Sequence, residues 1–504
     1  MGDSLLVIDE GTSSTRAMLV DADGRIGAMA QRELTTRYPQ RGWVEQDAEQ
    51  IWRLTLEAAR EAIGDRAKDT AAIGITNQRE TITFWDRTSG AALAPAIVWQ
   101  DRRTADACAS LRGAGNEPSI QAKTGLLLDP YFSATKIAWA LDHWPQLRAA
   151  GDRLCVGTVD SWLVFRLTGG LHVTDATNAS RTQLMDLRGG WDDGLCSLFG
   201  VPRRALPEII DCVGLTGVTA TEHFGRPIPI TGMAGDQQAA AIGQGCFAPG
   251  DTKATYGTGA FILTHAGATP PVSANRLLST VAWQLGGKRT YALEGSLFVA
   301  GQMIHWLRDE LGVIAATADC EALARTVADS GGVQIIPAFA GLGAPHWQPQ
   351  ARGAIMGLTL GSTRAHIVRA ALEAVANQTA ELQRAFAADG VDWSCLKIDG
   401  GMAMNDFLAQ DLADILAIAV ERPANVESSA LGAAMLASVG AGLHPDLGTA
   451  AASMQHVGAK FEPAIDPLQR EARLAAWDRS VGSLITLSDW FFDARSSKRE
   501  KNPS

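Results

Sequence analysis

A carboxylate, a glycine and a run of hydroxyl residues open the chain, and this combination suits a phosphate group and its metal ion. The apolar run Leu5–Ile8 has the length of a buried strand, and Asp9 follows it directly. A carboxylate at the end of a buried strand is costly unless it has a partner, such as a magnesium ion. Gly11 permits a turn with positive φ, and residues 12–15 offer hydroxyl and amide donors to an anion. A plain polar β-turn is the alternative for this stretch.

Three further charged residues could take part in chemistry. Asp236 lies in "PITGMAGDQQAAAIGQG", after a glycine and before an alanine-rich helical run. It could cap that helix, or it could act as a general base that accepts a proton from an attacking hydroxyl. Arg79 and Glu80, in "GITNQRETITFWD", follow an apolar strand, where a rigid sheet positions loop residues. Adjacent charges are usually surface residues, but an arginine donor beside a carboxylate acceptor is what recognition of a polyol requires.

Repeated strand patterns must position these residues. Strand-like and helix-like segments alternate, as in "AAIGIT" followed by "RTADACASLRG", which favours an α/β fold. The segment Asp251–Gly267, "DTKATYGTGAFILTHAG", repeats the opening order of β-rich run, glycine turn and second β-rich run. We therefore predict two similar halves with a boundary near Cys246–Gly250. In "KIDGGMAMNDF" a strand and glycines precede a helix, whose N-terminal amides could receive an anion.

Length, composition and charge exclude several classes of protein. The chain of 504 residues is too long for one core, and 46% hydrophobic and 20% charged residues are typical of a soluble globular protein. It contains no long apolar stretch and no signal peptide, so we expect a cytoplasmic protein without membrane insertion. The net charge of −11 argues against nucleic acid as a partner. The seven cysteines lack C-x-x-C spacing, which predicts buried thiols.

The motifs of the common nucleotide-binding folds are absent from the sequence. "LGGKRT" lacks the leading glycine and the final hydroxyl of a P-loop, and no strand is followed by G-x-G-x-x-G. H-E-x-x-H and G-x-S-x-G are also missing, which argues against a metalloprotease and an α/β-hydrolase. Phosphate binding by glycine and hydroxyl hairpins is the interpretation that remains.

Nine motifs in a fixed order resemble the FGGY family of carbohydrate kinases. They are "DEGTSSTR", "GITNQRET", "WQDRR", "DPYFSATK", "GDQQAA", "YGTGAF", "YALEG", "WLRDE" and "DGGMAMNDF". "NQRET", "WQDRR" and "DPYFSATK" resemble the glycerol kinase branch in particular, and the resemblance runs from about residue 5 to about residue 490. It implies an α/β fold in which two actin- and Hsp70-like (ribonuclease H-like) ATPase domains flank a nucleotide cleft. The expected domains are residues 1–247 and 248–495, with a disordered tail at 496–504.

The resemblance also implies a reaction and a set of site residues. The reaction would be in-line transfer of the γ-phosphoryl group of ATP to glycerol, with Mg²⁺, to give sn-glycerol 3-phosphate. Catalysis is assigned to Asp236, as the general base, and Arg16. The glycerol site would consist of Arg79, Glu80, Trp99, Tyr131, Asp236, Gln237 and Phe261. The β- and γ-phosphates would contact Thr12, Ser13, Ser14, Arg16 and Thr258. The adenosine would be bordered by Gly301, His305, Gly401 and Asn405. The metal ion would be held by Asp9 and, through water, Asp236. A homodimer or homotetramer is expected.

Two positions differ from the family pattern. Glu10 stands where many relatives carry glutamine, and it adds negative charge next to the expected phosphate site. His305 stands where bacterial relatives have a glutamine near the adenine. The alternatives to a glycerol kinase are another polyol or sugar kinase of the family and an actin-like ATPase without a phosphoryl acceptor. The Arg79-Glu80 pair and the aromatic residues argue against the ATPase, since it needs no polyol pocket.

One loop bears on regulation. Some relatives bind fructose 1,6-bisphosphate through a loop of the form "GGKGGTR", and the corresponding segment here is Thr221–Gly232, "TEHFGRPIPITG". Gly225 and Arg226 supply too few amides and charges for two phosphates, so we predict no inhibition by this effector. His223 is displaced by one residue from the histidine that other relatives phosphorylate, and an exposed surface histidine is the preferred interpretation.

Overall fold

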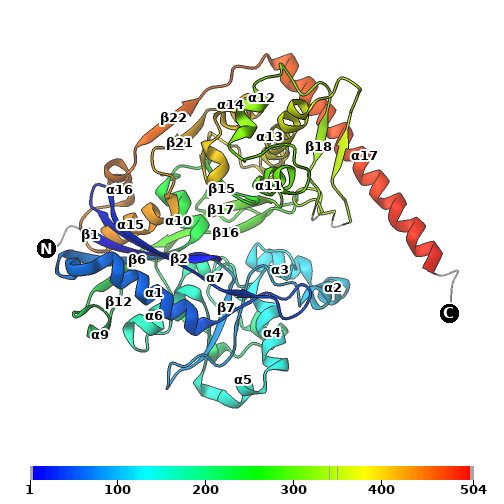
Figure 1. The fold of residues 1–504 in the computed structure, drawn as a ribbon. Helices are drawn as coiled ribbons and strands as arrows, with labels where there is room; N and C mark the ends of the chain where they lie inside the picture. Colours follow the sequence, from blue (N-terminus) through cyan, green and yellow to red (C-terminus); the bar gives the residue numbers. More distant parts are fainter. Residues whose placement is uncertain (1–3, 340, 349, 500–504) are drawn as a thin grey trace.

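A large β-sheet lies in each half of the chain (Figure 1). The structure is a computed structural model that describes residues 4–339, 341–348 and 350–499. The first sheet has the strand order β12-β13-β6-β1-β2-β3. Its strands are β1 (Ser4–Glu10), β2 (Ser14–Asp21), β3 (Ile26–Glu33), β6 (Thr70–Asn77), β12 (Val213–Val218) and β13 (Pro229–Gly235).

The second sheet has the strand order β16-β17-β15-β14-β20-β21-β22. Its strands are β14 (Asp251–Tyr256), β15 (Ala260–Gly267), β16 (Leu278–Leu285), β17 (Lys288–Leu297), β20 (Cys395–Asp399), β21 (Val420–Pro423) and β22 (Val457–Phe461).

The two sheets repeat one topology. In the first sheet, β1 pairs antiparallel with β2, β2 pairs antiparallel with β3, and β6 and β13 extend the sheet in parallel. In the second, β14, β15 and β17 form the antiparallel part, and β20 and β21 form the parallel part. The hairpins β1-β2 and β14-β15 therefore hold equivalent places, which confirms the two similar halves expected from the sequence. Residues 244–250 connect the halves, and we propose that the domain boundary lies there.

Smaller sheets and helices surround the two large sheets. One small sheet has the order β4-β5-β8-β7-β9, and two pairs are β10-β11 and β18-β19. These strands are β4 (Thr36–Arg37), β5 (Glu45–Gln46), β7 (Ile82–Asp86), β8 (Ala96–Ile97), β9 (Leu154–Thr158), β10 (Val173–Asp175), β11 (Glu208–Ile210), β18 (Gln334–Ile336) and β19 (Ala354–Met356). Helices of the first half are α1 (Ala48–Ile63), α2 (Ala105–Gly113), α3 (Glu117–Thr124), α4 (Ser133–His143), α5 (Pro145–Ala150), α6 (Val159–Thr168), α7 (Ala176–Ala179), α8 (Asp193–Leu198), α9 (Thr221–Phe224) and α10 (Asp236–Gly243).

The second half carries longer helices. They are α11 (Gly301–Asp309), α12 (Asp319–Ala324), α13 (Arg364–Ala388), α14 (Asp406–Leu416), α15 (Ser428–Gly440), α16 (Leu447–Met454) and α17 (Pro467–Arg499). Short 3₁₀ helices are η1 (Gly64–Asp69), η2 (Gly151–Arg153), η3 (Arg203–Ala205) and η4 (Gly401–Met404). Because α17 continues to Arg499, residues 496–499 of the predicted disordered tail are helical, and residues 500–504 lie outside the described residues.

Alternation along β1 decides which way each of its side chains points. Leu6 and Ile8 pack in the cluster that contains α1 and α6, whereas Leu5 and Val7 pack in the cluster that contains α10 and α15. Because successive side chains of a strand point to opposite faces, Asp9 shares the face of Leu5 and Val7. The structure thus directs Asp9 toward the second half of the chain.

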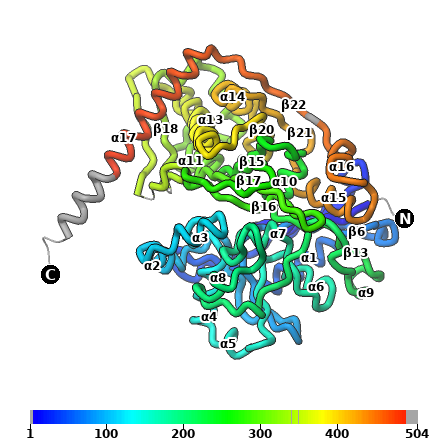
Figure 2. The backbone as a smooth tube through the Cα atoms, turned by 180° about the vertical axis from the view of Figure 1, so that it is seen from behind, coloured from blue at the N-terminus to red at the C-terminus, as the bar shows by residue number. Residues whose placement is uncertain are grey.

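Helices α10 and α15 lie next to each other between the two halves (Figure 2). A Cβ atom at Gly243 would lie 1.9 Å from the carbonyl oxygen of Ser428, and one at Gly432 would lie 1.8 Å from that of Ala239. Only glycine permits so close an approach of two helix backbones. Helix α15 also packs on β1, β6 and β13, so the second half of the chain covers one face of the first sheet.

Two other sequence predictions concern membranes and cysteines. Among the described residues, no helix combines the length and apolar character needed to span a bilayer. The cysteines are free thiols, and six of them are buried while Cys395 is half-buried, which agrees with the prediction of buried thiols.

Candidate functional site

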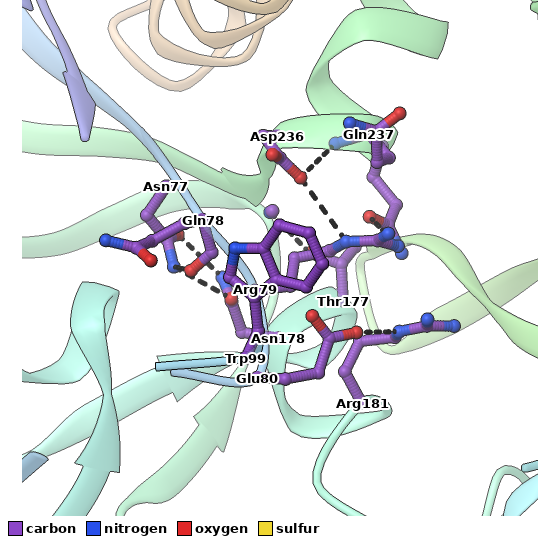
Figure 3. A network of polar contacts seen from close by, with 12 residues as sticks. Asn77, Gln78, Arg79, Glu80, Trp99, Thr177, Asn178, Arg181, Asp236 and Gln237 are labelled. Atoms are coloured by element: carbon purple, nitrogen blue, oxygen red, sulfur yellow. Dashed lines mark hydrogen bonds and ion pairs between the residues drawn. The ribbon is translucent and has the colours of Figure 1, made fainter. Parts of the chain in front are cut away.

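Arg79 and Glu80 are buried side chains directly after β6, so the interpretation as surface charges is wrong. They are 2% and 1% exposed. Glu80 has a φ of 62°, in the left-handed region that non-glycine residues seldom adopt and that is concentrated at functional sites. The preceding Asn77 at the end of β6 exchanges side-chain hydrogen bonds of 3.0 Å with Asn178, which anchors the strand end (Figure 3).

A continuous series of ion pairs joins Glu80 to Asp236. Glu80 Oε1 accepts a 2.5 Å hydrogen bond from Arg181 Nε, and Arg181 Nη2 donates to Glu294 Oε1 at 2.8 Å. Glu294 also accepts from Arg79 Nη1 at 2.6 Å and from Nη2 at 3.2 Å. Arg79 Nε lies 3.3 Å from Asp236 Oδ1. Figure 3 shows the Arg181-Glu80 and Arg79-Asp236 contacts. We call these five residues the charge network.

A glycine makes room for Arg79 beside Asp236. A Cβ atom at Gly235 would lie 2.7 Å from Arg79 Cγ, so a larger residue before Asp236 would displace the arginine. The backbone N–H of Gly235 donates to the Thr177 hydroxyl at 2.9 Å, which holds the end of β13. Asp236 is therefore the first residue of α10 rather than its cap, and its side chain is 31% exposed.

Each of four polar side chains at this site has a donor or acceptor that forms no hydrogen bond with another described residue. The guanidinium group of Arg79 has five N–H bonds. Two are bound by Glu294, one donates to Gln238 at 3.3 Å and the Nε–H faces Asp236. One Nη2–H, on the same edge as the Nε–H, has no acceptor in the described part of the chain. Glu80 Oε2, Asp236 Oδ2 and the Tyr131 hydroxyl likewise form no hydrogen bond with the described residues.

Three aromatic rings from distant parts of the sequence meet at Trp99. Its ring centroid lies 5.6 Å from that of Tyr131 and 6.2 Å from that of Phe261, both in edge-to-face geometry. Trp99 follows β8, Tyr131 precedes α4, and Phe261 belongs to β15 of the second sheet. None of the three is fully buried. The structure thus brings together all three aromatic residues that the sequence singles out, in a half-exposed cluster rather than in the core.

The first glycine turn lies beside this cluster. Trp99 Nε1 donates a hydrogen bond of 2.8 Å to Thr12 Oγ1, and Ser13 is exposed at the tip of the turn. The expectation of a positive φ at Gly11 is wrong, because Gly11 is not in the left-handed region. The lack of a side chain at Gly11 instead permits a tight turn. The Gly11 N–H donates to the carbonyl oxygen of Ser14 at 3.0 Å, and a Cβ atom at Gly11 would lie only 3.1 Å from that oxygen.

Asp9 has a protein partner in Arg16. The Arg16 guanidinium group forms an ion pair with Asp9 and donates to Glu427 Oε2 at 2.6 Å. Asp9 is 4% exposed, and burial raises the pKa of its carboxyl group while Arg16 opposes this shift. Glu427 directly precedes α15, so Arg16 connects the first hairpin to the second half of the chain. Arg16 itself is partly exposed.

Asp236 is in an environment that suits a general base. Burial raises the pKa of Asp236 above its ordinary value, and Arg79 and Lys253 oppose the shift. The backbone N–H of Gln237 donates to Asp236 Oδ1 at 2.7 Å, which fixes the carboxylate. Lys253 binds the side-chain oxygen of Gln237 and donates to Thr255 Oγ1 at 2.8 Å. Gln237 therefore contacts Asp236 through its backbone and Lys253 through its side chain.

The second glycine turn lies against the start of α11. The carbonyl oxygen of Thr258 accepts from the backbone N–H groups of Ala300 and Gln302 at 2.9 and 3.0 Å, and that of Gly257 accepts from Gly301 at 2.9 Å. A Cβ atom at Gly301 would lie 2.6 Å from the Gly257 oxygen, so glycine is required there. The second glycine turn and the first residues of α11, which include Thr258 and Gly301, are thus joined by backbone hydrogen bonds.

The remaining residues expected near adenosine are on neighbouring segments. A Cβ atom at Gly301 would lie 3.5 Å from Met402 Cγ, which places η4 and Gly401 next to α11. A Cβ atom at Gly401 would meet no atom within 4 Å. His305 is exposed on α11, one turn after Gly301. Asn405 caps α14, since its Oδ1 accepts from the Leu408 N–H at 2.9 Å.

Glu10 does not add charge to the phosphate site, contrary to the sequence-based expectation. It points to the opposite face of β1 from Asp9, is 0% exposed, and accepts a 2.7 Å hydrogen bond from Thr55 of α1. Burial raises the pKa of Glu10 to about 8. At neutral pH the group is therefore mostly protonated and uncharged.

The donor set fits a magnesium ion. Asp9 and Asp236 offer carboxylate oxygens, which are the ligands that Mg²⁺ prefers, and Asp9 raises the pKa of Asp236, as expected for neighbouring carboxylates. The described residues contain no group of three or more His, Cys, Asp or Glu side chains that could hold a metal. Mg²⁺ at phosphoryl-transfer sites needs only one or two carboxylates, because substrate phosphates and water complete its shell.

Sequence reasoning missed several residues of the site. Arg181 and Glu294 of the charge network were not selected, although Glu294 lies in the quoted motif "YALEG". For Glu294 the available signal was a carboxylate in the mainly apolar stretch Tyr291–Gly295, because a buried charge needs a partner. Lys136 and Lys253 also contact site residues, and Glu427 pairs with Arg16, which is 411 positions away in sequence. Pairings of that kind cannot be read from a single sequence.

Comparisons with known proteins agree with this geometry. Residues 4–243 match the N-terminal domain of the FGGY family of carbohydrate kinases, and residues 252–441 match its C-terminal domain. The chain is 53% identical over 492 residues to a glycerol kinase of Methylobacterium nodulans, covering 95% of this chain and 98% of that protein. It is 52% identical over 493 residues to a glycerol kinase of Gluconobacter oxydans, covering 96% of each chain.

Solved structures show the same fold. A glycerol kinase of Plasmodium falciparum with ADP superimposes with a TM-score of 0.92 at 34% identity, covering 96% of this chain and 99% of that one. A xylulose kinase of Rhodospirillum rubrum has a TM-score of 0.85 at 27% identity, covering 97% and 100%. Both the sequence matches and the actin-like topology of the two halves lead to one conclusion. This chain belongs to the FGGY family of carbohydrate kinases.

Proposed function

We propose that this chain phosphorylates glycerol with ATP to give sn-glycerol 3-phosphate and ADP. The observation that carries the proposal is the set of unused polar atoms on Arg79, Glu80, Tyr131 and Asp236, next to the contacting rings of Trp99, Tyr131 and Phe261. Each hydroxyl of a polyol both donates and accepts, so its site needs donors and acceptors together. Aromatic faces suit the carbon chain. Relatives about half identical to this chain are glycerol kinases, which supports the proposal.

Asp236 acts on the hydroxyl that is phosphorylated. Its free oxygen accepts the hydroxyl proton as the glycerol oxygen forms a bond to the γ-phosphorus, and the bond from that phosphorus to the β–γ bridging oxygen breaks. A pKa raised by burial makes the carboxylate a better proton acceptor. Arg79 and Glu80 bind the other hydroxyls, and the hydroxyl of Tyr131 donates to one of them.

The two glycine turns receive the phosphates. Thr12, Ser13 and Ser14 of the first turn and Thr258 of the second supply hydroxyl and amide donors, and Arg16 adds positive charge. Catalysis then comes mainly from positioning and charge neutralisation, as in other phosphoryl transfers. Approach of the two halves excludes water, which otherwise competes with glycerol as acceptor.

Nucleotide and metal complete the proposed site. The related Plasmodium protein was solved with ADP, which supports a nucleotide on the side of Gly301, His305, Gly401 and Asn405. Asp9, and Asp236 through water, would hold Mg²⁺. The ion would supply positive charge that offsets the charge developing on the phosphate oxygens.

One assay tests the proposal. ADP release is measured with ATP and Mg²⁺ in the presence and absence of glycerol, and we expect release that depends on glycerol. Tyr131→Phe keeps the ring and removes one hydroxyl donor, so we expect a rise in KM for glycerol of roughly 3- to 10-fold. Equal ADP release with and without glycerol would reject the proposal in favour of an ATPase.

A sugar kinase is the second candidate, because xylulose kinases share the fold. The three contacting rings of Trp99, Tyr131 and Phe261 favour a short acceptor, since an extra carbon in a tight pocket is costly. We expect kcat/KM to be highest for glycerol among glycerol, erythritol, xylulose and ribulose. A higher value for one of the ketoses would assign the chain to that substrate instead.

A further inference from the structure

Glu294 is a charged residue of the second sheet that reaches the polyol site of the first half. It lies on β17, where it pairs with Leu263 of β15 and Leu278 of β16, and it is 1% exposed. Its carboxylate contacts both Arg79 and Arg181, at distances from 2.6 to 3.2 Å. Burial raises the pKa of Glu294, but the two guanidinium groups outweigh it and hold the pKa at about 2. Glu294 is therefore ionised at neutral pH.

The contact with Glu294 sets the orientation of Arg79. The end of the guanidinium group, Nη1 and Nη2, is bound by the two oxygens of Glu294. This bidentate pairing fixes the plane of the group and leaves the opposite edge, with Nε–H and one Nη2–H, toward Asp236. That edge carries the unused donor assigned above to a substrate hydroxyl.

Arg181 extends the same effect to the other side of the site. It is fully buried, donates to Glu80 and Glu294, and its guanidinium carbon lies 5.7 Å from the ring centroid of Tyr131. It also lies 5.4 Å from that of Phe132. Arg181 thus supports both an acceptor and a donor of the proposed glycerol site without being exposed to substrate itself.

The signs of the charges alternate along the network, and this matters for the carboxylates at its two ends. Buried charges are tolerated only when they are paired. Because Glu294 accepts two hydrogen bonds from Arg79 and one from Arg181, Glu80 and Asp236 do not have to neutralise the arginines alone. Each can therefore keep an oxygen free for a hydroxyl. Without the charge on Glu294, both arginines would be drawn toward Glu80 and Asp236 and would compete with the substrate.

We propose that Glu294 and Arg181 are positioning residues for the polyol. Through its contacts with Arg79 and Arg181, Glu294 of the second sheet orients the polyol-binding side chains of the first half. These are Arg79, Glu80 and Asp236. The proposal rests on the proposed glycerol phosphorylation. It predicts that changes in Glu294 weaken the glycerol site selectively and leave the nucleotide site, built from the glycine turns, nearly intact.

The first test is Glu294→Gln, which keeps the shape and removes the charge. We expect kcat/KM for glycerol to fall about 10²-fold, as for a misplaced reacting group, while the Kd for ADP changes less than about threefold. The matched control is Asp411→Asn. Asp411 forms a part-buried ion pair with Arg473, with one contact of 2.7 Å, in the core of the second half. It should lower Tm but leave KM for glycerol unchanged.

A second variant keeps the proposal testable if Glu294→Gln does not fold. Arg181→Lys retains the charge but cannot contact Glu80 and Glu294 together, because lysine lacks the planar fork. We expect a fall of roughly tenfold in kcat/KM for glycerol, again with an unchanged Kd for ADP. Calorimetry with glycerol alone and with ADP alone measures the two sites separately.

The outcomes separate this inference from the proposed function. Wild-type protein that does not phosphorylate glycerol would contradict the proposed function. Wild-type protein that does so, together with variants of unchanged kcat/KM, would overturn the role of Glu294 and Arg181. Equal loss of glycerol and ADP binding would also overturn it, because that result indicates a general structural role.

Discussion

The indole N–H of Trp99 donates a hydrogen bond of 2.8 Å to the hydroxyl of Thr12. Trp99 contacts the other two rings of the proposed glycerol pocket, and Thr12 belongs to the turn proposed to bind phosphate. The proposed glycerol and phosphate sites therefore share a direct contact.

Trp99→Phe tests this contact, since it keeps an aromatic wall and removes the indole donor. We expect kcat to fall roughly 3- to 10-fold, because the Thr12 side chain loses its fixed partner. Steady-state kinetics with each substrate varied in turn would measure the effect. Unchanged kcat would show that Thr12 does not depend on Trp99.

Asp236→Asn should nearly abolish phosphoryl transfer. The amide cannot accept the hydroxyl proton, and a general base typically contributes about 10²- to 10⁴-fold. Binding of ADP, measured by calorimetry, should stay close to that of the wild type and serves as the control for folding. A variant that retains most of its turnover would remove Asp236 from the mechanism.

Glu10→Gln should leave activity within about threefold and change how stability depends on pH. The pKa of Glu10 is about 8 in the folded protein and near 4.5 in the unfolded chain. Between these values the folded state holds one more proton, so wild-type stability decreases as pH rises, by about 1.4 kcal/mol per unit. The stability of Glu10→Gln should not show this decrease, because glutamine does not titrate. We would measure the free energy of unfolding in urea at pH 5 and pH 8. The value for the variant relative to that for the wild type should be higher at pH 8 than at pH 5.

Lys136→Met should give the opposite trend. Lys136 is buried and donates to the carbonyl oxygens of Tyr131 at 2.7 Å and Trp99 at 3.4 Å. Burial lowers the pKa of Lys136 to about 7, whereas the unfolded value is 10.5. Between these values the unfolded chain holds the extra proton, so wild-type stability rises with pH.

The same urea experiment is done at pH 7 and pH 9. The free energy of unfolding of the wild type relative to Lys136→Met should increase by about 1.4 kcal/mol per pH unit. KM for glycerol should rise as well, because the backbones of Trp99 and Tyr131 lose a shared anchor. A pH-independent difference between the two proteins would contradict the assignment of the lysine as a titrating group.

Fructose 1,6-bisphosphate should not inhibit the enzyme. Arg226 donates to the carbonyl oxygens of Ala67 and Lys68 at 3.1 and 3.0 Å, so its guanidinium group is already engaged. His223 is only half-exposed and its Nε2 contacts the Arg166 carbonyl oxygen at 3.1 Å. Titration of the effector at fixed glycerol and ATP would measure the response, and saturable inhibition at millimolar concentration would contradict the prediction.

The sequence by itself determined the fold class and the repeated hairpins, and it predicted most of the candidate site residues. Local signals were sufficient for these. An apolar run ended by Asp9 predicts a strand and a turn, and "YGTGAF" repeats the pattern in the second half. The order of the motifs identified the family. Trp99, Tyr131 and Phe261 were selected from sequence, and the structure brings them together.

The tertiary structure decided which charges meet. Arg16 pairs with Glu427, which is 411 positions away in sequence, and Arg79 pairs with Glu294, which is 215 positions away. No local pattern encodes such a contact, because it depends on how two sheets and their crossovers pack. The ionisation of Glu10 was likewise misjudged from sequence. The acidic residue is adjacent to Asp9 in the chain, but strand alternation places it on the other face of β1, where burial rather than the phosphate site sets its charge.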